Sequence, residues 1–239
     1  MKIKAFIRKI ASYFINKDYA EITFWRKEIR NYVKWYLREI GEHYETPSPH
    51  EYEKIDVGIL EHNAILTWLV CHQQKKYLQN LALTRDVFKG MKVLDVGSGP
   101  MPSATVFTGA EVYCLDPLFP DYMQAQFPFH YSSARFICGR SESIPCQNDF
   151  FDAIISINAL DHVDNFMQTA KEIERVLKPN GKVRLYLHYH KKTITEPIEL
   201  NDEIIQSNFM FCNIAKVSET KIENALQDDT ERYVLWSNF

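Results

Sequence analysis

The chain has 239 residues, of which 46% are hydrophobic and 25% are charged, and its formal net charge is -3. This composition is typical of a soluble globular protein and excludes a disordered or low-complexity chain. The small negative net charge disfavours nucleic acid as a partner, because duplex-binding proteins present a broad basic surface. The length allows one large domain with an appended segment.

The sequence contains no run of 18 apolar residues, and charged residues interrupt the hydrophobic positions of the N-terminal stretch MKIKAFIRKIASYF. We therefore expect a cytoplasmic protein without stable membrane insertion. The five cysteines include no C-x-x-C pair. This argues against a disulfide framework and a structural zinc site, and it predicts reduced thiols in the core.

Residues 1–85 are predicted to be helical in three pieces. Apolar residues recur at helical spacing from Ile3 to Phe14, from Ile22 to Ile40 and from Ile59 to Leu81. The two prolines of TPSPHEYEK separate the second helix from the third. The mildly basic surface of residues 1–45 is either a solvated helical face or a surface for a membrane or an anionic partner.

From Met91 onward, short apolar runs alternate with helical stretches. The clearest helix is predicted at 164–177, capped by Asp164, and a second at 201–209. A short helix is expected before the last strand. This alternation predicts an α/β fold, a doubly wound and mostly parallel sheet with helices on both faces. The seven predicted strands are 91–96, 111–116, 134–139, 151–158, 182–190, a strand near 210–217, and 232–238.

The first strand leads into the glycine-containing stretch VLDVGSGPMPSA, residues 93–104. Ligands of open parallel sheets bind at the carboxyl ends of the strands, so Asp95, Gly97, Ser98 and Gly99 are predicted at that edge. The two glycines let a ligand approach the backbone closely, and Asp95 is expected to face the crevice. Asp116 ends the second strand, where such folds place a carboxylate for ribose hydroxyls. The pattern indicates an adenosine-containing ligand.

The same stretch discriminates between adenosine ligands. A dinucleotide site requires G-x-G-x-x-G, and Pro102 stands at the third glycine position. An acid two residues before the first glycine suits a positively charged ligand better than one bearing phosphates. S-adenosylmethionine, with its sulfonium and ammonium groups, meets that requirement.

Four stretches in this order resemble the class I S-adenosylmethionine-dependent methyltransferases, in the group that includes ubiquinone-biosynthesis-type and small-molecule enzymes. They are VLDVGSGP, EVYCLDP, GRSESIPCQNDFFDAIISINALDHVDN and IERVLKPNGKVRLYLH. The resemblance spans residues 91–190 and implies a Rossmann-like methyltransferase fold for residues 86–239. It also implies S-adenosyl-L-methionine as cofactor, with residues 1–85 as a helical extension or lid.

The resemblance implies a role for each matching residue. Asp116 would take the ribose hydroxyls, Ser141 and Glu142 would border the adenine, and Asn158 would lie beside the methionine part. The implied cofactor-binding residues are Asp95, Gly97, Ser98, Gly99, Asp116, Pro117, Ser141, Glu142 and Asn158.

Three positions depart from that pattern or imitate another one. Met101 stands where the family often has a third glycine, and Arg140 stands where it often has an acid near the adenine. Pro145-Cys146-Gln147 matches the tripeptide around the nucleophile of cytosine-C5 methyltransferases. Here it precedes the fourth strand instead of following it, so we expect Cys146 to have no nucleophilic role.

Three histidines are predicted near the methyl-transfer crevice. His188 and His190 lie two apart on the fifth strand and therefore on one face, and His162 follows the fourth strand. His190, His188 or His162 is the candidate general base, and Lys191-Lys192 would hold an anionic group. Two alternatives remain: a metal site of three imidazoles, and a purely structural role for the histidines. The preferred interpretation assigns no metal to the site.

The aromatic residues of the N-terminal helices allow two interpretations. Trp25, Tyr32, Trp35, Tyr36 and Trp68 recur at helical spacing, which is typical of core packing. Relatives commonly use helices before the first strand as a lid that excludes water during transfer. We expect this segment to cap the crevice.

These observations predict an S-adenosylmethionine-dependent methyltransferase that acts on oxygen of a small polar or anionic metabolite, and they leave its oligomeric state open. The first alternative is an NAD(P)-dependent oxidoreductase on the same architecture. The second is a non-catalytic S-adenosylmethionine-binding subunit.

Overall fold

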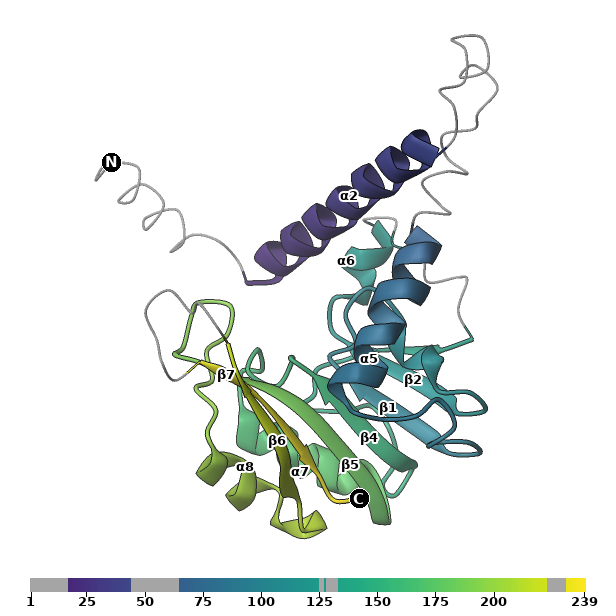
Figure 1. The fold of residues 1–239 in the computed structure, drawn as a ribbon. Coiled ribbons are helices and arrows are strands. Elements are labelled where there is room, and N and C mark those ends of the chain that lie inside the picture. The colour runs from purple at the N-terminus through teal and green to yellow at the C-terminus, as the bar shows by residue number, and fades with distance from the viewer. Residues whose placement is uncertain (1–16, 44–64, 125–126, 128–132, 223–230) are drawn as a thin grey trace, which may run out of the picture.

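The computed structural model describes residues 17–43, 65–124, 127, 133–222 and 231–239 (Figure 1). Its strands are β1 (Lys92–Val96), β2 (Glu111–Asp116), β3 (Arg135–Cys138), β4 (Phe151–Ile157), β5 (Leu177–Tyr189), β6 (Ala215–Lys221) and β7 (Arg232–Ser237). Its α-helices are α2 (Lys17–His43), α5 (Gln74–Asn80), α6 (Phe119–Gln124), α7 (Phe166–Val176) and α8 (Asp202–Asn208). Shorter turns are the π-helical η1 (Leu69–Gln73) and the 3-10 turns η2 (Ser103–Val106) and η4 (Met210–Cys212).

The seven strands form one sheet in the order β3-β2-β1-β4-β5-β7-β6. The pairings β1 with β2 and β4, β2 with β3, and β4 with β5 are parallel, whereas β7 is antiparallel to β5 and β6. The chain order reverses direction between β1 and β4, the position where open α/β sheets bind ligands. The predicted doubly wound, mostly parallel sheet is confirmed.

Alternate residues of the central strands enter two separate cores. Leu94 belongs to the core that contains Ile173 of α7, whereas Val93 packs into the core that contains Tyr77 of α5. Successive side chains of a strand point to opposite faces, so an apolar run such as 92–96 requires cover on both sides. Helices α5 and α6 cover one face, and α7 and α8 cover the other (Figure 1).

Helix α7 begins two residues later than the sequence pattern suggests. Its N-cap is Asn165, whose side chain accepts a hydrogen bond from the backbone N–H of Gln168. The prediction of Asp164 as the cap is wrong, because the Asp164 carboxylate instead pairs with Arg140, with 2.7 Å between Nη1 and Oδ2. Because Asp164 forms this ion pair with Arg140, the neighbouring side chain of Asn165 caps the helix instead.

The helix expected up to Leu81 is present over the described residues 65–80, with the π-helical turn η1 in its middle. Helix α2 runs past α5 and α6 (Figure 1). Trp25 and Ile29 of α2 pack against Trp68 and Met101. The predicted helix from Ile3 to Phe14 and the TPSPHEYEK loop lie outside the described residues.

The C-terminal strand near 210–217 begins later than predicted. Residues Met210–Cys212 form the 3-10 turn η4, Asn213 adopts a left-handed backbone (φ 51°), and β6 starts at Ala215. The left-handed residue ends the turn and delays the strand. The short helix expected before β7 falls on residues 223–230, outside the described part.

All five cysteines are free. Cys114 is buried in one core as expected, and Cys146 and Cys212 are half-buried and pack against the other. The expectation of a core position is wrong for Cys71 and Cys138, which are exposed. None of the described helices combines the length and the apolarity needed to cross a bilayer.

Candidate active site

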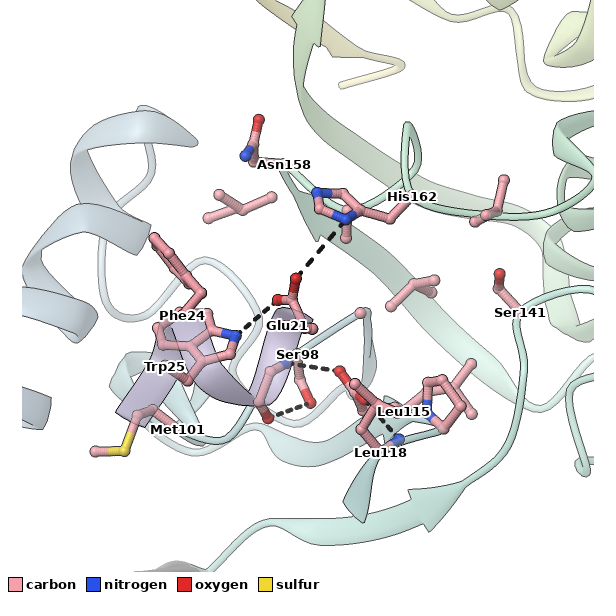
Figure 2. Close-up of a pocket in the computed structure, with 18 of the residues that line it drawn as sticks. Glu21, Phe24, Trp25, Ser98, Met101, Leu115, Leu118, Ser141, Asn158 and His162 are labelled. Atoms are coloured by element: carbon pink, nitrogen blue, oxygen red, sulfur yellow. Dashed lines mark hydrogen bonds and ion pairs between the residues drawn. The ribbon is translucent and has the colours of Figure 1, made fainter. Parts of the chain in front are cut away.

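A cavity of about 800 Å³ opens at the carboxyl edge of the sheet. It collects side chains from α2, α5, the loop after β1, the end of β2, and the segments after β3 and β4 (Figure 2). Eight of the nine predicted cofactor residues line it: Gly97, Ser98, Gly99, Asp116, Pro117, Ser141, Glu142 and Asn158. Residues up to 61 positions apart in the sequence therefore meet at the predicted edge.

The glycine loop has little room for side chains. Gly97 and Gly99 have φ angles of 70° and 63°, in the left-handed region that disfavours residues with a Cβ. A Cβ on Gly97 would lie 2.3 Å from Cβ of Ala159, and one on Gly99 would lie 3.2 Å from Cζ2 of Trp25. The loop is therefore pressed between the segment after β4 and helix α2, and its backbone borders the cavity directly.

Asp116 reaches the cavity from the end of β2. One carboxylate oxygen accepts a hydrogen bond from the N–H of Gly99 and the other from the N–H of Leu118, both at 2.9 Å. Burial raises the pKa of Asp116 to about 6, and these two backbone donors oppose that rise. Each oxygen keeps a second lone pair, so the carboxylate can still accept from ribose hydroxyls.

Asp95 does not face the crevice as expected. Its side chain is 0% exposed, and its Oδ2 accepts a hydrogen bond of 2.9 Å from the hydroxyl of Tyr77, which does line the cavity. Burial raises the pKa of Asp95 to about 7. The reason for the difference is the position of Asp95 on the strand. Asp95 lies two residues after Val93 and therefore shares its face of the sheet, which packs against Tyr77 of α5.

Asn158 follows β4 and holds a left-handed backbone, with a φ of 50°. Its N–H is bonded to the carbonyl of Tyr186, which fixes the residue at the cavity wall. Its side-chain Oδ1 is buried and has no hydrogen-bond partner among the described residues. Native proteins rarely leave such an acceptor unpaired, so this oxygen is suited to a ligand that donates, such as an ammonium group.

Ser141 and Glu142 line the far end of the cavity. The hydroxyl of Ser141 lies 3.1 Å from that of Thr169. One oxygen of Glu142 accepts from the backbone N–H groups of Asp164 and Asn165. Glu142 thus holds the β4–α7 connection in place as well as bordering the cavity.

Helix α2 supplies site residues of which the sequence interpretation named only Trp25, and that one without assigning it a contact. Lys17, Glu21, Phe24 and Trp25 line the cavity, and their spacing places them on one helical face. Trp25 donates from Nε1 to Glu21 Oε1 at 2.8 Å, and Lys17 bonds the carbonyl of His162. These residues belong to the segment that is expected to cap the crevice, and its role as a lid stays a prediction. The helical spacing of 17, 21, 24 and 25 could have identified them.

His162 is the predicted catalytic histidine that lines the cavity. Its Nδ1 lies 3.9 Å from Oε2 of Glu21 (Figure 2). Its Nε2 lies 3.8 Å from Oε1 of Glu196. These distances exceed those of hydrogen bonds, so each ring nitrogen stays available to a ligand.

His188 and His190 are close to each other, with ring centroids 4.5 Å apart, but neither is among the residues that line the cavity. Nε2 of His190 lies 3.0 Å from Oδ2 of Asp161, and Nδ1 lies 2.7 Å from the carbonyl oxygen of Lys191. The hydrogen bond with Asp161 raises the pKa of His190 to about 9. With both nitrogens donating, this imidazolium has no lone pair to take a proton.

The cations at the cavity differ from those expected. Lys191 and Lys192 are exposed and do not line it, whereas Lys17, Lys76 and Arg140 do.

Cys146 also lies away from the cavity, and burial raises the pKa of its thiol. A thiol that ionises less readily is a poorer nucleophile, in agreement with the expectation that Cys146 has no such role.

Comparisons with known proteins agree with this geometry. Residues 94–185 match a family described as a methyltransferase domain. A sterol 24-C-methyltransferase from Pneumocystis carinii is 37% identical over 119 residues, which are 46% of this chain and 30% of that protein. An uncharacterized methyltransferase from Mycobacterium bovis is 37% identical over 98 residues, 40% of this chain and 39% of that protein.

Among solved structures, the YcgJ protein from Bacillus subtilis superposes with a TM-score of 0.54 at 16% identity. The match covers 70% of this chain and 97% of that one, and it shows a shared fold. The chain spans well under half the length of the two curated relatives, 30% and 39%.

Proposed function

We propose that the chain is a class I S-adenosylmethionine-dependent methyltransferase that transfers a methyl group to an oxygen atom of a small polar or anionic metabolite. Residues 94–185 match a methyltransferase domain, which supports this proposal. The observation that carries this proposal is the pairing inside one cavity of a glycine-lined cofactor cradle with a histidine between two carboxylates.

The residues of the cradle suit the cofactor. The backbone of the glycine loop borders the cavity, Asp116 offers free lone pairs, and Asn158 offers an unpaired oxygen. When bound, S-adenosylmethionine supplies a methyl group on a positively charged sulfur, which a nucleophilic oxygen can displace directly. The protein's part is then to align the acceptor and exclude water, an effect worth up to about 7–11 kcal/mol.

His162 is the residue proposed to take the hydroxyl proton as the oxygen attacks. It lines the cavity, and neither ring nitrogen is held by a hydrogen bond, unlike those of His190. Glu21 and Glu196 would stabilise the imidazolium that forms, as an acid does beside a catalytic base.

The acceptor side of the cavity favours a polar substrate over a sterol. Its walls carry Glu21, His162 and Glu196, and the cations Lys17 and Arg140 are near. A bound sterol would cover these charged side chains with apolar surface. They would lose water without gaining hydrogen-bond partners, at a cost of several kcal/mol. The name of the sterol methyltransferase relative therefore does not extend to the substrate proposed for this chain.

The proposal can be tested with the purified full chain. S-adenosylmethionine and S-adenosylhomocysteine should bind in calorimetry, and hydroxyl-bearing anionic metabolites should yield S-adenosylhomocysteine. A carbon-13-labelled methyl group should appear as an O–CH3 signal by NMR. Label on carbon or nitrogen would contradict the choice of oxygen.

A matched pair of variants isolates the cradle. Asp116→Asn should weaken cofactor binding about 10- to 100-fold, since it removes a charged hydrogen-bond acceptor. Asp121→Asn, on an exposed position of α6, should bind as the wild type does.

The two alternative functions make different predictions. An oxidoreductase would gain thermal stability from nicotinamide cofactors and none from S-adenosylmethionine. A non-catalytic subunit would bind S-adenosylmethionine but transfer no methyl group to any acceptor in a broad screen.

A further inference from the structure

Beside the cavity, four metal-binding side chains meet: Asp161, His188, His190 and Glu196. One ligand atom from each lies within 4.8 Å of those of the other three. They come from three segments: the turn after β4, the end of β5 and the loop that follows it. We propose that these four residues bind a divalent transition-metal ion such as Zn²⁺.

The spacing of the group is close to that of a coordination shell. Nitrogen and oxygen ligands lie about 2.0–2.2 Å from Zn²⁺, so two tetrahedral ligand atoms are roughly 3.4 Å apart. His190 Nε2 and Asp161 Oδ2 are already 3.0 Å apart. The remaining ligand atoms need to move inward by about an ångström to complete the shell.

The outer partners of the two imidazoles match those of metal-bound histidines. Nδ1 of His190 lies 2.7 Å from the carbonyl oxygen of Lys191, and Nε2 of His188 lies 3.0 Å from Oε1 of Glu231. Metal-ligating histidines usually donate their other N–H to a carbonyl or a carboxylate in this way. Nδ1 of His188 is thereby left for an ion. Nε2 of His190 shares a proton with Asp161, and a bound ion would take the place of that proton.

The two carboxylates are also held in place. Asp161 is 0% exposed, and its Oδ1 has no hydrogen-bond partner among the described residues. The N–H of Glu196 bonds Oγ1 of Thr193, and its carbonyl accepts from the N–H of Thr193. The N–H of Ile198 bonds the carbonyl of Asp161, which ties this loop to the turn after β4.

The choice of ion follows from the donors. Two imidazoles favour Zn²⁺, Fe²⁺ or another transition metal over Mg²⁺ and Ca²⁺, which prefer oxygen ligands alone. Of the four residues, Glu196 lines the cavity, and His188 stacks on Tyr233, another lining residue, at 4.7 Å between centroids. A bound ion would thus fix the wall of the acceptor side without touching the cofactor cradle.

The test uses Zn²⁺ and Co²⁺ alone with the full chain, after treatment with a chelator. We expect one equivalent of ion by calorimetry and elemental analysis, and visible Co²⁺ absorption bands that Zn²⁺ abolishes. His188→Gln and Glu196→Gln should each lower the affinity more than 10-fold, since even outer partners contribute that much. Both positions are only partly buried, so thermal melting in chelator should confirm that these variants fold.

Two control variants carry the same chemical changes outside the group. They are Glu199→Gln, in the same loop as Glu196, and His72→Gln, in the turn η1. Both residues are exposed. They should bind the ion as the wild type does. Absence of ion binding by the wild type, or unchanged affinity in either His188→Gln or Glu196→Gln, would overturn the proposal. Neither result depends on the methyl acceptor, so the proposed function is judged separately.

Discussion

The hydroxyl of Tyr77 donates a hydrogen bond of 2.9 Å to the carboxylate of Asp95, and both side chains are buried. Tyr77 belongs to α5 and Asp95 to β1, so this contact fastens the helix that borders the cavity to the strand beneath the glycine loop. Among the described residues, it is the one side-chain hydrogen bond to Asp95, whose other oxygen is unpaired.

Tyr77→Phe should destabilise the protein by about 1–3 kcal/mol, because it leaves a buried carboxylate unsatisfied. In the wild-type protein, the hydrogen bond from Tyr77 lowers the pKa of Asp95, because it stabilises the ionised carboxylate. The cost of losing it should therefore be larger at pH 8 than at pH 5. Urea unfolding at both pH values measures this. Tyr113→Phe removes a similar hydrogen bond, to Glu111. That carboxylate is partly exposed and also pairs with Arg135, so the loss should cost less than about 0.5 kcal/mol. Equal costs in the two variants would contradict the prediction.

Asp95 should make the protein less stable as the pH rises. Its pKa is about 7 in the folded state and 3.8 as the reference value, so the folded state binds more protons between these values. Its contribution is greatest below pH 4 and is lost by about pH 7, a loss of roughly 4 kcal/mol. Burial also raises the pKa of Asp116, to about 6, so Asp116 should likewise make the protein less stable as the pH rises.

Asp95→Asn should therefore reduce the fall in unfolding free energy between pH 5 and pH 8. Asp152→Asn is the control, because ion pairing with Lys178 and a hydrogen bond from Lys92 lower the pKa of Asp152. That group is ionised throughout this range, so its variant should keep the wild-type slope. An unchanged slope in Asp95→Asn would show that Asp95 does not titrate there.

Gly97→Ala should cost more stability than Gly90→Ala. Both glycines have positive φ angles, 70° and 77°, so each substitution carries a backbone penalty of about 1–2 kcal/mol. A Cβ at Gly90 meets nothing within 4 Å, whereas one at Gly97 lies 2.3 Å from Cβ of Ala159. The overlap should add about 1–3 kcal/mol.

Denaturant unfolding of the two glycine variants measures that difference. Cofactor affinity should fall in Gly97→Ala and stay unchanged in Gly90→Ala. The same affinity in both variants would mean that the loop does not form the cradle.

His162→Gln should lower kcat by about 100- to 10,000-fold if His162 removes the acceptor proton. Cofactor affinity should change little, because the residue borders the acceptor side. His72→Gln, an exposed histidine outside the cavity lining, should keep the wild-type kcat. A variant that retains the wild-type kcat would eliminate His162 as the base.

Local sequence patterns were sufficient for the sheet and for the position of the glycine loop at its carboxyl edge. Strands such as 92–96 are short apolar runs that only a doubly covered sheet can bury, and the glycines at 97 and 99 require backbone that most residues avoid. These features depend on near neighbours in the chain, so they can be read without knowing the packing.

Contacts between distant segments determined the rest. The pairing of Asp95 with Tyr77, the face of α2 that carries Glu21 and Trp25, and the separation of His162 from His190 depend on how helices and loops pack on the sheet. The strand pattern places His188 and His190 on one face but cannot reveal Asp161 and Glu196 beside them. Hydrogen bonds and ion pairs act over a few ångströms in space, whatever the separation along the chain, and only the folded chain sets those distances.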